Sequence, residues 1–173
     1  MIPVGATPKT MTPEEEERLE QCGFEAQSLV RARRYPEAEA LARSIPTPAA
    51  YTAYLHEKVA AFTDLGRALL GSGERDHARG LLNEAETLAA LMRDADWEEA
   101  YTLFDIGEIW RDAGDTDEAV RLWDACLIHG RGKDTLKLFA RIYRELRSMG
   151  LHEKAEHVVT LVPRGYPLNQ GSD

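Results

Sequence analysis

The chain has 173 residues, 43 % of them hydrophobic and 29 % charged, which is typical of one globular domain with a sizeable core. No apolar run approaches the roughly 18 residues of a membrane-spanning helix, and a formal net charge of −9 argues against non-specific binding of nucleic acid by the whole molecule. The first residues lack the apolar segment of a signal peptide, and Cys22 and Cys126 lack metal-ligand spacing. We therefore expect a cytoplasmic protein with reduced thiols.

Helix-forming residues dominate the chain. Residues 1–12 are expected to be disordered, residues 13–162 to form one helical domain, and residues 163–173 to form a tail, because Pro163 and Pro167 cannot continue a helix. No segment alternates between apolar and polar residues for long enough to predict a strand. The sequence therefore predicts an all-α fold. The clearest helical windows contain Phe62, Leu65 and Leu69; Leu103, Ile106 and Trp110; and Phe139, Ile142 and Leu146.

Four short turns punctuate the helical windows at intervals of about 40 residues, a period typical of stacked helical hairpins. Each turn ends in an alanine that opens the next helix. A small side chain there lets two antiparallel helices pack closely, and glycines on the first helix of a pair do the same at some cost in helix propensity. The turns are RRYPEA, GSGERDHA, AGDTDEA and MGLHEKA, which end at Ala38, Ala78, Ala119 and Ala155, and the glycines are Gly66 and Gly107.

These units resemble the tetratricopeptide repeats, whose pattern is W-x2-L-G-x2-Y followed by a small residue, an aromatic residue and another small residue. The third unit carries Leu103, Ile106, Gly107, Trp110, Gly114, Ala119, Trp123 and Cys126 in that register, and the second carries Phe62, Leu65, Gly66, Leu69, Gly73, Ala78, Leu82 and Ala85. The fourth unit has Tyr143 at the glycine position. The resemblance implies a right-handed α-solenoid of about four antiparallel hairpins. It also implies a non-enzymatic protein-interaction module without a cofactor.

An acidic segment in the third turn raises the alternative of a cation site. A calcium loop needs a central glycine and a glutamate at its twelfth position, but Gly114 comes too early and Trp123 stands twelfth when counting begins at Asp112. We therefore expect Asp115 or Asp117 to cap the following helix.

No catalytic motif emerges elsewhere. The histidines form no HExxH pattern, HGRGKDT lacks the residues of a phosphate-binding loop, and the serines lie outside any nucleophile motif. The sequence thus predicts neither catalytic nor metal-binding residues.

Basic residues are concentrated near the C-terminus. Residues 130–164 carry a net charge of +4, from eight basic and four acidic residues, against −13 for the remainder. On a helix, Lys133, Lys137, Arg141 and Arg144 fall within about 80° of arc. In the tetratricopeptide family the first helix of each hairpin lines a concave groove. The resemblance places this basic stripe there, with Thr63, Arg67, Tyr101, Phe104, Asp105, Glu108 and Arg111 from the two preceding units.

A groove with aromatic residues and a cationic end would suit a protein or peptide partner that carries acidic groups. Lys137 and Arg141 fall where the family's carboxylate clamp has two cations, whereas Asp105 and Arg67 stand where it has asparagines. The aromatic residues would bury apolar anchors and the cations would pair with acidic groups. The predicted partner-binding residues are Arg67, Tyr101, Phe104, Glu108, Arg111, Lys137, Arg141 and Arg144.

Several alternatives remain open. The basic stripe on residues 133–148 could be only a solvated face, or it could bind nucleic acid or another polyanion, which would show steep salt dependence. An enzyme with an all-α cavity is a third alternative. No polar capping helix follows the fourth hairpin, so Val158, Leu161 and Val162 would need the tail or another copy of the chain to cover them.

Overall fold

The computed structural model describes residues 11–48, 52–92, 98–130 and 133–168, and these contain helices and no strand. This confirms the predicted all-α class. None of the described helices is both long enough and apolar enough to cross a membrane. The helices are α1 (Pro13–Arg31), α2 (Tyr35–Ser44), α3 (Ala53–Gly71), α4 (Arg75–Ala89), α5 (Glu98–Asp112), α6 (Thr116–His129), α7 (Lys133–Ser148) and α8 (His152–Leu161), with one 3-10 turn at Ala90–Met92.

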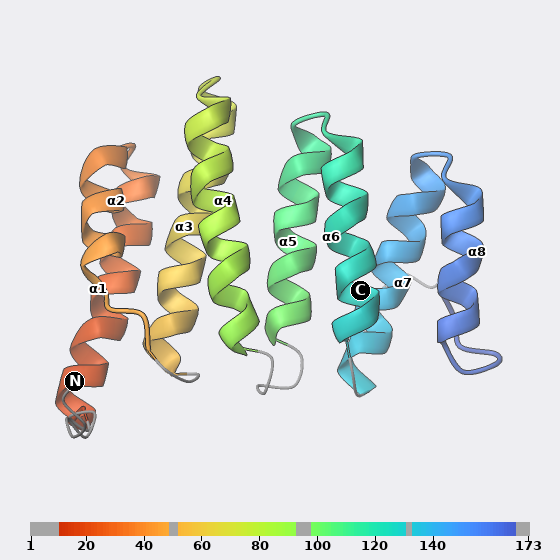
Figure 1. Ribbon diagram of the computed structural model, residues 1–173, viewed down its shortest axis with the longest axis horizontal. Coiled ribbons are helices and arrows are strands. Elements are labelled where there is room, and N and C mark those ends of the chain that lie inside the picture. The colour runs from red at the N-terminus through yellow and green to blue at the C-terminus, as the bar shows by residue number, and fades with distance from the viewer. Residues whose placement is uncertain (1–10, 49–51, 93–97, 131–132, 169–173) are drawn as a thin grey trace, which may run out of the picture.

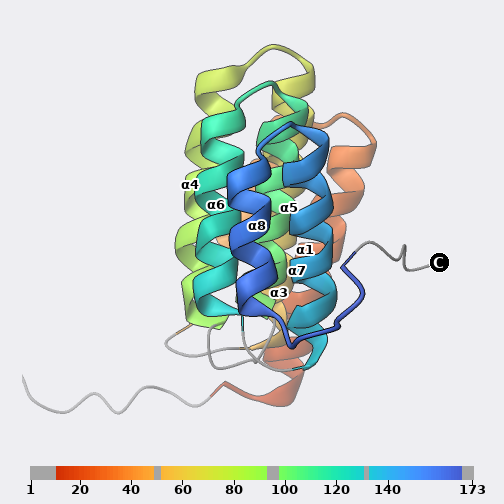
Figure 2. The same cartoon turned by 90° about the vertical axis from the view of Figure 1, so that its right-hand side faces the viewer.

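The helices pack as antiparallel pairs, α1 with α2, α3 with α4, α5 with α6, and α7 with α8. Figure 1 shows the pairs standing side by side along the long axis of the molecule. Figure 2, viewed along that axis, shows α4, α6 and α8 on one side and α3, α5 and α7 on the other. Each pair also contacts its neighbours, chiefly through α1 with α3, α4 with α5, and α5 with α7.

The turn within each pair has the same backbone geometry. A residue with positive φ occupies the same place in all four turns: Arg33 (60°), Gly73 (87°), Gly114 (79°) and Gly150 (77°). The next N–H donates back across the helix end to the residue five positions earlier, as from Glu74 to the Leu69 carbonyl, at 2.9 Å in every turn. This is the Schellman arrangement, which satisfies carbonyls that the helix end leaves free. Glycine suits it because it has no Cβ to clash.

Capping side chains define two helix starts. Thr12 and Glu15 form a reciprocal capping box at α1. Residues 1–10 of the segment that was expected to be disordered lie outside the described residues, but Thr12 is structured. The Asp115 carboxylate accepts a bond from the Glu118 N–H at 3.3 Å and caps α6, which confirms the capping prediction for the third turn.

The predicted small residues lie at the helix contacts. Ala38, Ala78, Ala119 and Ala155 are all fully buried. A Cβ built on Gly66 would approach the Leu82 side chain to 2.6 Å. Gly23 on α1 makes an equally close approach, to Glu57 on α3, that the sequence did not indicate.

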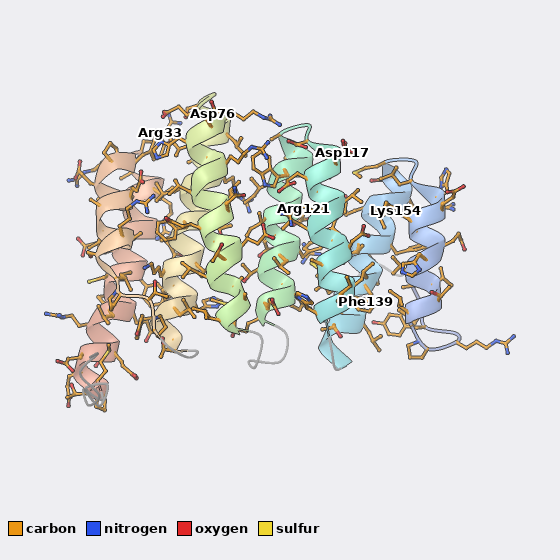
Figure 3. The ribbon with its side chains drawn as sticks, in the orientation of Figure 1. Arg33, Asp76, Asp117, Arg121, Phe139 and Lys154 are labelled. Carbon is orange, nitrogen blue, oxygen red and sulfur yellow. The ribbon has the colours of Figure 1, made fainter. Side chains whose placement is uncertain are left out.

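Ion pairs tie the even-numbered helices together at the surface. Arg43 of α2 binds Glu84 of α4 at 2.8 Å, Arg121 of α6 binds Glu86 of α4 at 2.7 Å, and Lys154 of α8 binds Asp124 of α6 at 2.9 Å. Arg121 and Lys154 are labelled in Figure 3. Because these groups are partly exposed, each pair contributes no more than about 1 kcal/mol.

The C-terminal tail belongs partly to the packed structure. Leu168 is buried in the hydrophobic core, and Val162 and Tyr166 pack against it. Part of the segment expected to form a tail, residues 163–173, therefore packs on the helical domain predicted for residues 13–162. Val158 is fully buried, whereas Val159 and Leu161 remain exposed.

Candidate partner-binding face

Six charged residues line up across α3, α5 and α7. Asp64, Asp105 and Arg141 each precede the glycine of their turn by the same interval, and Arg67, Glu108 and Arg144 follow them by three residues. Residues three apart on a helix lie on one face. We call the surface formed by these six residues the odd-helix face.

Two hollows of about 200 Å³ each lie between α3 and α5, and Arg67 lines both of them. The first is polar and contains Asp64 and Asp105. The second lies nearer the turns, between Leu70 and Ile109. Arg67, predicted as a binding residue, thus lies beside both of these hollows. Its side chain is exposed.

The carboxylates of the first hollow are only loosely compensated. Burial raises the pKa of Asp64, against the opposing charges of Arg67 and Arg31. Burial likewise raises the pKa of Asp105, against Arg141 and Arg67. Within the described part of the chain, neither carboxylate forms an ion pair or a hydrogen bond. Both are available to a hydrogen-bond donor from outside the protein.

Phe104 does not face this surface, contrary to the prediction. Its side chain is fully buried, and its ring stacks on Trp123 with centroids 5.9 Å apart. The Arg141 guanidinium also lies over the ring, 4.2 Å from its centroid. Phe104 is therefore a core residue, because α5 is covered by α4, α6 and α7 together. An inner helix of this kind has more than one buried stripe.

Arg141 and Arg111 already have carboxylate partners. Arg141 binds Glu108 at 3.2 Å, and Arg111 binds Glu145 and, at 2.7 Å, Asp112. Burial raises the pKa of Glu108 despite the nearby charges of Arg141 and Arg111. The Arg141–Glu108 and Arg111–Glu145 pairs join α5 to α7, so part of the predicted cationic end serves the packing of the two helices.

The remaining predicted residues differ in exposure. Lys137 is exposed on α7 and forms no ion pair with any described residue. Tyr101 and Arg144 are half-buried, and Tyr101 packs against the core. The side chain of Lys133 lies outside the described residues. Of the three cations of the predicted stripe whose side chains the structure describes, Lys137 is thus the one best placed to meet a partner.

The sequence contained a signal for the acidic hollow that was not used. Asp64 precedes Leu65-Gly66 and Asp105 precedes Ile106-Gly107, so the two carboxylates hold corresponding positions in successive units. Corresponding positions on neighbouring first helices lie side by side in a row of hairpins. Asp64 was nonetheless missed. The hollow also places Asp105 beside Arg67, so a carboxylate bound there would meet a negative charge.

Cys126 offers no reactive group on this face. Cys126 is buried and its thiol donates to the Ala100 carbonyl at 3.2 Å, and burial raises its pKa well above the usual value. Among the described residues, no group of three or more His, Cys, Asp or Glu side chains is arranged to hold a metal ion.

No protein-family model matches the chain, and no curated protein or solved structure matches it significantly. The odd-helix face is therefore interpreted from its own geometry.

Proposed function

We propose that the row of hairpins is a right-handed tetratricopeptide-like solenoid that acts as a non-enzymatic protein-interaction module, such as an adaptor, scaffold or regulatory domain. Its partner would be a protein or peptide that lies along the odd-helix face. The observation that carries this proposal is the pair of hollows around Arg67 between α3 and α5. Side chains of an extended partner need such recesses in order to be held specifically.

Acidic groups of the partner would contact Lys137, and would contact Arg67 outside the first hollow, where the charge of Asp105 would repel them. Both side chains are exposed, and neither is held in an ion pair by another described residue. Arg111 and Arg141 would take part less directly, because Glu145 and Glu108 already neutralise them. The half-buried carboxylates Asp64 and Asp105 would accept hydrogen bonds from the partner and fix its register.

The experiment compares three forms of the full chain as baits in extracts of the host cell, with captured proteins quantified by mass spectrometry. Wild type is set against Arg67→Glu with Lys137→Glu, and against a control with two reversals elsewhere on the surface, Arg18→Glu with Arg164→Glu. Partners of the odd-helix face should be lost with the first double variant and kept with the second. The proposal fails if both variants capture the same proteins as wild type.

Binding of nucleic acid by the α7 basic stripe receives less support. Arg141 is paired with Glu108 and covers the Phe104 ring, so it is not free to neutralise a phosphate. A polyanion site would show an affinity for single-stranded RNA that falls steeply with salt, and Lys137→Glu would weaken it equally for all sequences.

A further inference from the structure

Three of the four buried polar residues in the described part of the chain occupy one position of the repeating unit. Lys58, Glu99 and Thr135 stand at the same interval before the glycine of their turns, and all three are buried. Glu99 lies within ion-pair distance of His129, whose Nδ1 is 3.1 Å from the Glu99 carboxylate. Lys58 is different, because it is a cation at 6 % exposure with no carboxylate of the described residues within ion-pair distance.

Neutral oxygens hold the Lys58 ammonium. Its Nζ donates to the Ile45 carbonyl at 2.6 Å and to the Thr47 hydroxyl at 3.3 Å. A buried charge without a counterion is unfavourable. Burial accordingly lowers the pKa of Lys58, Glu84 partly offsets this, and the charge of Arg43 adds to it.

Lys58 lines a pocket of about 420 Å³ between α2, α3 and α4. This is within the size range of small-molecule sites. Phe62 and Leu88 lie at its floor, with only 1 % and 7 % of their surfaces exposed, and the ammonium lies 5.8 Å from the centroid of the Phe62 ring. Arg43 lies over the same ring at 5.5 Å. The pocket therefore combines a cation with a floor of largely covered aromatic and aliphatic side chains.

The charges around the pocket leave Lys58 uncompensated. Arg43 also lines it, but both oxygens of Glu84 accept from Arg43 at 2.8 Å, and Glu39 accepts from its Nε at 2.8 Å. The guanidinium is thus neutralised and fixed in place. The positive charge that remains for a ligand is that of Lys58.

We infer that this pocket binds a small organic carboxylate, whose charged group pairs with Lys58 and whose apolar body lies over Leu88 between the exposed Gly80 and Thr87. An anion there supplies the counterion that the fold omits. The alternative is that Lys58 only secures the Ile45 carbonyl at the end of α2, where a cation is favourable in any case. If Lys58 pairs with a ligand, an added carboxylate should shift the pKa of Lys58. If Lys58 only secures the Ile45 carbonyl, the carboxylate should leave that pKa unchanged.

The test uses a matched pair of probes, phenylacetate and its neutral analogue phenylacetamide. Protein labelled with ¹³C at the lysine ε-carbons is titrated with pH by NMR, and the Lys58 signal is assigned by its loss in Lys58→Met. A bound anion favours the protonated amine, so phenylacetate should raise the pKa of Lys58 and phenylacetamide should not. By linkage, phenylacetate should bind less tightly as pH rises through the pKa of the unliganded amine.

Variants provide the second measurement. Lys58→Met should weaken phenylacetate binding at least tenfold, whereas Lys154→Met, which removes a lysine of α8 paired with Asp124, should leave it unchanged. If Lys58→Met does not fold, Lys58→Arg, which keeps the charge, supplies the assignment by the same loss of signal, and the titration of wild type then decides. The inference is overturned if phenylacetate leaves the Lys58 titration unchanged, or if the amide binds as tightly as the acid.

Discussion

Gly107 of α5 and Trp123 of α6 lie so close together that a Cβ on the glycine would stand 2.4 Å from the indole nitrogen. The indole is fully buried and its N–H donates to the Phe104 carbonyl at 3.3 Å. A rigid ring with a fixed hydrogen bond cannot move aside as a leucine side chain can. The distance between α5 and α6 is therefore set by the absence of a side chain at residue 107.

Gly107→Ala should destabilise the protein. Overpacking a core lowers the free energy of unfolding by about 1–3 kcal/mol. The higher helix propensity of alanine offsets at most about 1 kcal/mol of this loss. We expect a net loss of about 1–2 kcal/mol in the free energy of unfolding, measured by urea denaturation with circular dichroism.

Gly80→Ala is the matched control for that measurement. Gly80 is an exposed residue within α4, and a Cβ there would meet nothing within 4 Å. The same substitution should therefore stabilise the protein by up to about 1 kcal/mol. Equal effects of the two substitutions would contradict the close contact of Gly107 with Trp123.

The pairing of the helices could be predicted from sequence because small residues recur where helices touch. Ala78 and Gly66 are placed by the period of the turns, and both lie at contacts in the structure. Phe104 could not be placed, since helical periodicity reveals that a helix has an apolar face but not how many neighbours it has. Lys58 was overlooked for a related reason. Lys58 is held by Ile45 and Thr47, which follow α2 of the preceding hairpin, and a single sequence does not show that contact.

Arg33 is the exception among the four turns. It adopts φ of 60°, where the other three turns have glycine, and a side chain in this region costs about 1–2 kcal/mol. Arg33→Gly should therefore raise the free energy of unfolding. The gain should be nearer 1 kcal/mol than 2, because glycine also adds freedom to the unfolded chain.

Gly114→Ala provides the opposite change in the third turn. It places a Cβ on a residue with φ of 79° and should destabilise the protein by a comparable amount. Thermal melts followed at 222 nm would measure both variants. A lower melting temperature for Arg33→Gly would show that the arginine side chain stabilises its turn by contacts that outweigh the backbone strain.

Asp105 should make stability depend on pH in an unusual direction. Burial raises its pKa, and the charges of Arg141 and Arg67 do not fully reverse this. A carboxyl whose pKa is higher in the folded state contributes stability that is complete below its unfolded pKa of about 4 and is lost as pH rises through the folded pKa. Asp105→Asn removes the ionised form, so the variant should be more stable than wild type at pH 7, and the difference should vanish below about pH 4.

Asp115→Asn should show the reverse dependence. Burial raises the pKa of Asp115, but bonds from the Glu118 N–H, Arg75 and Arg79 together bring it below the usual value. The stability that Asp115 contributes is therefore present above pH 4 and lost in acid, so its asparagine variant should be less stable than wild type at pH 7. Urea denaturation of both variants from pH 3 to pH 8 measures the two trends. If the two asparagine variants shift stability in the same direction at pH 7, the opposite environments of Asp105 and Asp115 are not what governs their ionisation.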